Sequence, residues 1–201
     1  MENRMPIAFF CRAKPQNADA LEIFLKARRV FLGYPLMKGA ENYDPTNLES
    51  CIVHPACPPE EWAREITGKK HRRMYSQNRN LIADVVPGSL VVIPRPESGL
   101  AYIGHIEGEF EVVNSPPWAE DYLKLRERQK LTIDDQADQH VTDVAQGWRV
   151  DEFKPVALSL IPGWLRHSMF GRSMFGRFRN HPLDDHETAH QVLSTILDGR
   201  S

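Results

Sequence analysis

Short apolar runs separated by turn-forming residues recur along this chain. Residues 5–11 form one run of strand length, and residues 90–94 and 100–106 form two more, joined by a turn rich in Pro and Gly. Residues 140–148 and 153–161 resume the strand-like pattern. Pro and Gly at the turns end each run, so the pattern predicts several short strands.

Helical spacing of apolar positions is found in fewer places. Residues 18–31 carry a rough helical stripe behind Asn17, which is suited to the N-cap position. Residues 120–130 are charged and helical in composition, and residues 184–198 predict an amphipathic C-terminal helix. Residues 68–79 are basic, and we expect them to be irregular. Strands scattered between single helices, without a regular βαβ alternation, favour the α+β class.

Composition is that of an ordinary globular chain. The 201 residues are 41% hydrophobic and 26% charged, with a net charge of −2. Contact with nucleic acid would therefore depend on local clusters of basic residues. With three cysteines, no apparent signal peptide and no apolar run long enough to span a bilayer, we expect a cytoplasmic protein with no membrane role.

The sequence resembles the PUA-like superfamily, and within it the EVE-like modules associated with restriction-type nucleases. Three motifs over residues 85–180 carry the resemblance: Gly-Ser-Leu-Val-Val-Ile-Pro at 88–94, Ile-Gly-His-Ile-Glu-Gly at 103–108, and the segment 144–148, which ends in Trp. Ser89 stands where that family usually has an acidic residue, and two residues are inserted before Trp148.

The resemblance implies a PUA-like mixed β-barrel surrounded by several helices. On this interpretation residues 1–201 form a single domain, with an N-terminal elaboration at 1–85, the barrel core at 86–180 and a C-terminal helix at 184–198. It further implies a pocket for a nucleobase, often a modified one flipped out of a duplex. Because no set of side chains in the sequence matches a catalytic motif, we expect a non-catalytic binding module without a cofactor. DNA is then favoured over RNA as the partner, and a nuclease or another defence subunit is a further candidate partner.

Base flipping costs a few kcal/mol, which stacking on aromatic rings and hydrogen bonds to the base edge offset. The chain offers aromatic and polar candidates for the base: Trp148, Tyr102, Trp118, Asp143, Gln146, Ser76 and Asn78. It offers arginines for the nucleic-acid backbone: Arg172, Arg177, Arg179, Arg166 and Arg95.

Two other functions stay open. An enzyme acting on a nucleotide or nucleic acid would use His105, His140 or Asp143 as acid–base groups. A protein-binding subunit of a defence system would use the acidic region 120–139 as its interface.

Two motifs have the spacing of metal ligands. His-Glu-Thr-Ala-His at 186–190 fits the zincin pattern, but no later His or Glu follows as a third ligand, so we expect a charged helix. Cys51, His54 and Cys57 are spaced three residues apart, and the sequence leaves open whether they bind zinc. We therefore assign neither a metal site nor catalytic residues.

Overall fold

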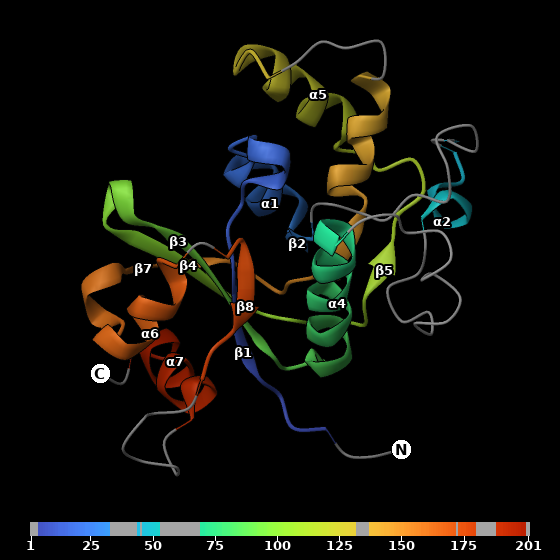
Figure 1. Ribbon diagram of the computed structural model, residues 1–201. Helices are drawn as coiled ribbons and strands as arrows, with labels where there is room; N and C mark the ends of the chain where they lie inside the picture. Colours follow the sequence, from blue (N-terminus) through green and yellow to red (C-terminus); the bar gives the residue numbers. More distant parts are fainter. Residues whose placement is uncertain are drawn as a thin grey trace. The chain divides into compact units, whose positions relative to one another are not determined.

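The computed structural model describes residues 4–32, 44, 46–52, 69–131, 137–171, 173–179 and 188–199. The chain divides into two compact units (Figure 1). Unit 1 contains the chain up to Arg12, Asp84–Glu109 and the chain from Arg149 onward; unit 2 contains Ala13–Ala83 and Phe110–Trp148. The segment 86–180, expected to form the barrel core, therefore contributes to both units.

Unit 1 is built on a five-stranded sheet in the order β7-β4-β3-β1-β8. Strands β1 and β3 are parallel, and the other neighbours are antiparallel. The strands are β1 (Ala8–Cys11), β3 (Leu90–Arg95), β4 (Leu100–His105), β7 (Lys154–Ala157) and β8 (Phe175–Arg177). The strand expected at 153–161 is thus shorter, since Leu158–Leu160 turns into the 3₁₀ helix η5.

Strands β3 and β4 form the predicted hairpin. They pair in register from Leu90 opposite His105 to Arg95 opposite Leu100. The 3₁₀ turn η3 (Pro96–Ser98) and Gly99, at a φ of +68°, connect them. Glycine adopts this left-handed conformation without a steric penalty, which explains the turn chemistry found in the sequence.

Two helices pack on one face of this sheet (Figure 1). Alternate strand residues, among them Phe10, Val92 and Ile103, form a core with apolar side chains of α6 (Gly163–Met169) and α7 (Ala189–Leu197). Helix α7 begins with a capping box between Thr188 and Gln191. It confirms a C-terminal helix, although residues 180–187 lie outside the described part of the chain.

In unit 2 the expected helix at 18–31 is shorter than predicted. The 3₁₀ turn η1 (Pro15–Asn17) precedes it, α1 occupies Leu21–Ala27, and β2 occupies Arg29–Phe31. Asn17 has a φ of +67° and is not the N-cap residue, which is Ala20. Arg28, at a φ of +48°, ends the helix in a left-handed conformation, and β-branched Val30 then extends the chain into the strand.

The remaining elements of unit 2 correct two further expectations. The basic segment expected to be irregular is part of helix α4 (Lys69–Asp84), whose last residue belongs to unit 1. Its Asn78 and Leu81 are buried at a spacing of three residues, as on the inward face of a helix. The strand expected at 140–148 is mostly the 3₁₀ helix η4 (Ala137–Val144), with strand β6 (Gln146–Arg149) after it.

A three-stranded sheet in the order β2-β6-β5 completes unit 2, with β5 at Glu111–Val112. Helices α2 (Leu48–Cys51) and α5 (Ala119–Arg128) belong to the same unit, and α5 confirms the predicted helix at 120–130. The mixed α+β class is therefore confirmed. The described strands form two sheets and no closed barrel, so the PUA-like barrel is not confirmed. None of the helices in the described ranges is long and apolar enough to cross a bilayer.

Candidate functional site

Gln146 and Trp148, two of the residues predicted to bind a base, share one face of the three-stranded sheet. They are alternate residues of β6, whose side chains point to the same side. The Trp148 ring packs edge-on against Phe110, with 5.2 Å between ring centroids, and Gln146 Nε2 donates to the Leu32 carbonyl at 2.8 Å. Trp148 is 0% exposed, so its ring is not available to stack on a base. Both side chains are part of the interior of unit 2.

Trp118 lies on the opposite face of that sheet. Glu111 pairs with Gly147 in register, so its side chain faces away from that of Trp148. The Arg29 side chain reaches Glu111, with 2.6 Å between Nη1 and Oε1, and its guanidinium lies 5.5 Å from the Trp118 ring centroid. The two tryptophans therefore do not form one aromatic cage.

Arg29 is a residue that sequence reasoning missed, because it was expected within the helix at 18–31 and was not singled out. Its side chain is only 7% exposed, and its Nε and Nη2 atoms have no hydrogen-bond partner within the described residues. A guanidinium edge of this kind carries two parallel N–H donors, which fit an oxyanion or the edge of a guanine base. The only sequence signal for its burial is its position directly before the apolar residues Val30 and Phe31.

Asp143, another predicted base contact, is the centre of a buried polar network. Its Oδ2 accepts from the Tyr122 hydroxyl at 3.1 Å and lies 3.2 Å from His140 Nδ1 and 3.6 Å from Arg126 Nη1. Asp143 and Arg126 are 4% and 6% exposed at the side chain. The carboxylate compensates the buried arginine charge, which is what burying a charge requires.

The same network engages both nitrogens of His140. Arg126 Nη2 lies 3.4 Å from His140 Nε2, and since a guanidinium can only donate, Nε2 accepts and Nδ1 donates to Asp143. Burial, followed by the nearby Asp143 charge, raises the pKa of Tyr122, so its hydroxyl stays neutral. His140 thus has no nitrogen available for a substrate proton in this arrangement.

Other predicted residues lie in unit 1 or on α4. Tyr102 is half-buried on β4, opposite Pro155 of β7. On α4, Ser76 is exposed, and Asn78 is buried. Two of the predicted arginines form ion pairs: Arg177 with Asp84, at 3.2 Å, and Arg95 with Glu97, at 2.7 Å. Arg179 is exposed and Arg166 is half-buried. Arg172 lies outside the described residues.

The metal motifs lie only partly in the described chain. Cys51 is buried and its Sγ accepts from the Asp44 backbone N–H at 3.1 Å, whereas His54 and Cys57 are not among the described residues. His190 Nε2 lies 2.9 Å from the Gly88 carbonyl, while residues 186–187 are also outside the described ranges. The described residues contain no group of three or more His, Cys, Asp or Glu side chains suited to a metal.

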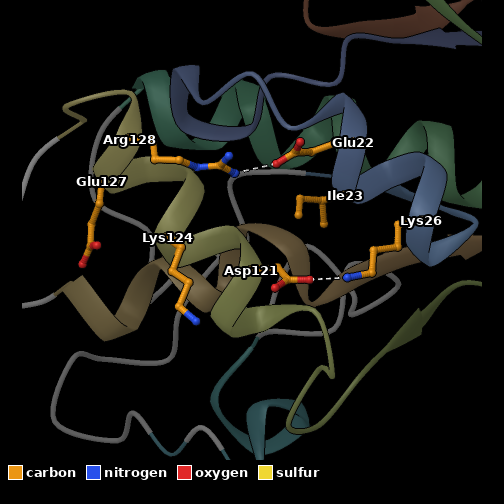
Figure 2. Close-up of a pocket in the computed structure, with 7 residues that line it drawn as sticks. All are labelled: Glu22, Ile23, Lys26, Asp121, Lys124, Glu127 and Arg128. Carbon is orange, nitrogen blue, oxygen red and sulfur yellow. Dashed lines mark hydrogen bonds and ion pairs between the residues drawn. The ribbon is translucent and has the colours of Figure 1, made fainter.

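A cleft of about 530 Å³ lies between α1 and α5 (Figure 2). Ion pairs between Lys26 and Asp121, at 2.5 Å, and between Glu22 and Arg128, at 2.7 Å, connect the two helices across it. Asp121 of α5 belongs to the acidic region 120–139 that was expected as a protein-binding surface. It is therefore paired with a lysine of the same unit.

Comparison with protein-family models, with curated proteins and with solved structures found no match to this chain. The PUA-like resemblance and the partners that it implies stay predictions.

Proposed function

We propose that this protein binds nucleic acid, with helix α4 as the main contact to the phosphate backbone. One observation carries the proposal. Five Lys and Arg residues and a histidine fall within one continuous 16-residue helix, whose only acidic residue is its last, Asp84. A helix of this length spans about 24 Å, enough to follow several phosphates. Local charge of this kind is what a chain of net charge −2 needs for nucleic-acid contact.

Spacing along α4 brings several of its basic positions to one side of the helix. Lys69, Arg73, Ser76 and Asn80 follow one another at intervals of three or four residues, and positions at that spacing gather on one side of a helix. Ser76 and Asn80 are exposed, while Leu81 is buried. By position along the helix, Lys69, Arg72 and Arg73 therefore share the side of the exposed Ser76 and Asn80.

We further propose that the protein recognises a base as well as the phosphate backbone. The resemblance to EVE-like modules, including their PUA-like barrel, favours a modified base in DNA held by an aromatic ring. Since Trp148 is fully buried, the half-buried Trp118 beside Arg29 is the better stacking surface. Stacking on an aromatic ring is worth about 1–3 kcal/mol per base. The cytoplasmic location and a nuclease partner belong to the same proposal.

Fluorescence anisotropy tests this function. The probes are identical duplexes carrying cytosine, 5-methylcytosine, 5-hydroxymethylcytosine or its glucosylated form, together with a matched single-stranded RNA, at a series of salt concentrations. The double variant Arg72→Ala/Arg73→Ala should weaken binding to every probe and lower the slope of log K against log salt by about 2. Trp118→Leu should instead remove discrimination among the bases.

The double variant Lys124→Ala/Arg128→Ala is the matched control. It removes the same charge from α5, where both side chains pair with acids, and should leave binding unchanged. Equal losses in the two double variants, or no binding by the wild-type protein at low salt, would overturn the proposal.

A further inference from the structure

Four charged or titratable side chains gather on one face of a two-stranded ribbon in unit 1. Ile106 and Val150 form an antiparallel bridge and are 1% and 2% exposed. On either side of the bridge, the Asp151 N–H donates to the His105 carbonyl at 3.0 Å, and the Glu107 N–H donates to the Arg149 carbonyl at 3.1 Å. Because side chains alternate along a strand, these four residues share the face opposite the buried pair.

Asp151 binds the His105 backbone and lies beside its imidazole. Asp151 Oδ1 accepts from the backbone N–H groups of His105, at 2.9 Å, and Glu152, at 2.5 Å. Its Oδ2 lies 3.4 Å from His105 Nδ1. The His105 side chain is 38% exposed, and Nε2 has no partner within the described residues. An imidazole whose Nδ1 lies near a carboxylate held by backbone N–H groups, and whose side chain is partly exposed, is suited to transfer a proton through Nε2, unlike His140.

Glu107 and Arg149 complete the cluster. Their side chains are 3.9 Å apart and 48% and 66% exposed, so the pair is loose enough to engage a ligand. His105 and Glu107, two positions apart on a strand, are separated by about 7 Å along the chain. Gly104 permits the close strand approach, because a Cβ there would lie 2.4 Å from Val150 Cγ1 and 2.6 Å from the Glu152 carbonyl.

We propose that His105, Glu107 and Arg149 form a catalytic site that cleaves RNA, with Asp151 as the positioning residue. The cluster has two proton-transfer groups and one cation but no hydroxyl, thiol or amine nucleophile. RNA supplies its own nucleophile in the 2′-hydroxyl next to each phosphodiester. A guanidinium suits the negative charge that develops on the phosphate oxygens.

The reaction balances without a further reactant. Glu107 takes the 2′-hydroxyl proton as the 2′-oxygen attacks phosphorus. The bond from phosphorus to the 5′-oxygen breaks, and His105 gives its Nε2 proton to that leaving oxygen. The products are a 2′,3′-cyclic phosphate and a 5′-hydroxyl. Water or the products then return the proton from Glu107 to His105.

For long RNA this activity rests on the proposed nucleic-acid binding, but a dinucleotide tests the chemistry by itself. Purified protein is incubated with UpA and with its 2′-deoxyuridine analogue, and the cyclic phosphate is quantified by mass spectrometry. The wild-type protein should cleave UpA and leave the deoxy analogue intact. His105→Ala and Glu107→Gln should each lower kcat by about 10²- to 10⁴-fold.

Two further variants sharpen the test. Asp151→Asn should lower kcat without raising KM, because it changes the orientation of His105 and leaves the substrate contacts in place. His167→Ala, which removes an exposed histidine of α6 in the same unit, should have full activity. Any of three results would overturn the inference: no cleavage of UpA by the wild-type protein, cleavage of the deoxy analogue, or full activity of His105→Ala.

Failure of the two proposals can be told apart. If Arg72→Ala/Arg73→Ala binds nucleic acid as tightly as the wild type while UpA cleavage still depends on His105, only the binding role of α4 is wrong. If that variant loses affinity but UpA is never cleaved, only the catalytic site is wrong.

Discussion

A Cβ atom at position 147 would lie 1.8 Å from the carbonyl oxygen of Val30, and the residue there is glycine. Strands β2 and β6 therefore approach more closely than any side chain at this position allows. We expect Gly147→Ala to lower the free energy of unfolding by about 3 kcal/mol, because the backbone of β2 must move. Urea unfolding measures the change. Gly108→Ala, where a Cβ meets nothing within 4 Å, is the control and should stay within about 0.5 kcal/mol of wild type.

The Arg29–Glu111 pair should be asymmetric in its response to mutation. Glu111→Ala leaves a buried guanidinium without its carboxylate and should destabilise unit 2 by about 1.5–3 kcal/mol. Arg29→Met removes the charge and keeps an apolar stem against Trp118, and replacements of this kind are often neutral or stabilising. A double-mutant cycle by thermal unfolding checks this. Equal losses for the two single variants would contradict the structure.

Asp143 should be needed more for folding than for ligand contact. Asp143→Ala leaves Arg126 as an uncompensated buried charge, and breaking such a pair costs about 3–5 kcal/mol. Tyr122→Phe removes only the hydroxyl, which donates to Asp143 and contacts the Pro15 carbonyl at 3.3 Å, and should cost about 1 kcal/mol. Chemical denaturation measures the free energy of unfolding of both variants, and Asp143→Ala should be the less stable. A nucleic-acid affinity that falls in folded Tyr122→Phe would instead favour a direct ligand role for this network.

The Cys11 thiol should be unreactive in the folded protein. Burial raises its pKa from the ordinary 9.0 to about 12, so almost no thiolate forms at pH 8. Iodoacetamide followed by peptide mass spectrometry should find Cys11 unmodified in the native state and labelled in urea. Above pH 9.0 the unfolded state loses a proton that the folded state retains, so this thiol lowers stability as the pH rises toward 12. Cys11→Ala should remove that part of the alkaline loss.

The Lys26–Asp121 ion pair between α1 and α5 should weaken in acid and at high salt concentration. A hydrogen bond and the charge of Lys26 lower the pKa of Asp121, so its contribution is present at neutral pH. The contribution is lost as the pH falls below 3.8, the ordinary value, and through the lowered pKa of the folded state. Thermal unfolding of Asp121→Asn should therefore depend less on pH in this range than that of the wild type. Because both groups are exposed, the same comparison at high salt should show a smaller difference.

Local patterns predicted the elements whose structure depends on neighbouring residues. The β3–β4 hairpin was predictable, because two apolar runs flank a Pro/Gly turn and the register follows from the turn. Helix α5 was predictable from its charged composition. The helix at 18–31 was overestimated, since its helical stripe continues into residues that pair with β6 as strand β2.

The site residues were less accessible to sequence reasoning. Trp148 and Trp118 were both recognised as aromatic candidates, but their separation onto two faces follows from the pairing of Glu111 with Gly147. His105 was recognised as an acid–base candidate, whereas Asp151, 46 residues later, was not. No spacing rule connects two residues that meet only because distant strands pair.

The sequence by itself determined the α+β class, the main hairpin, the C-terminal helix and the concentration of positive charge at residues 69–79. These follow from hydrophobic period, turn residues and composition, which act over a few residues. The tertiary structure decided which polar groups are buried and with which partners: Arg29 with Glu111, Asp143 with Arg126, and His105 with Asp151. Burial and pairing depend on chain segments that are far apart in sequence. For the same reason only the tertiary structure shows that both ring nitrogens of His140 have partners, whereas Nε2 of His105 has none within the described residues.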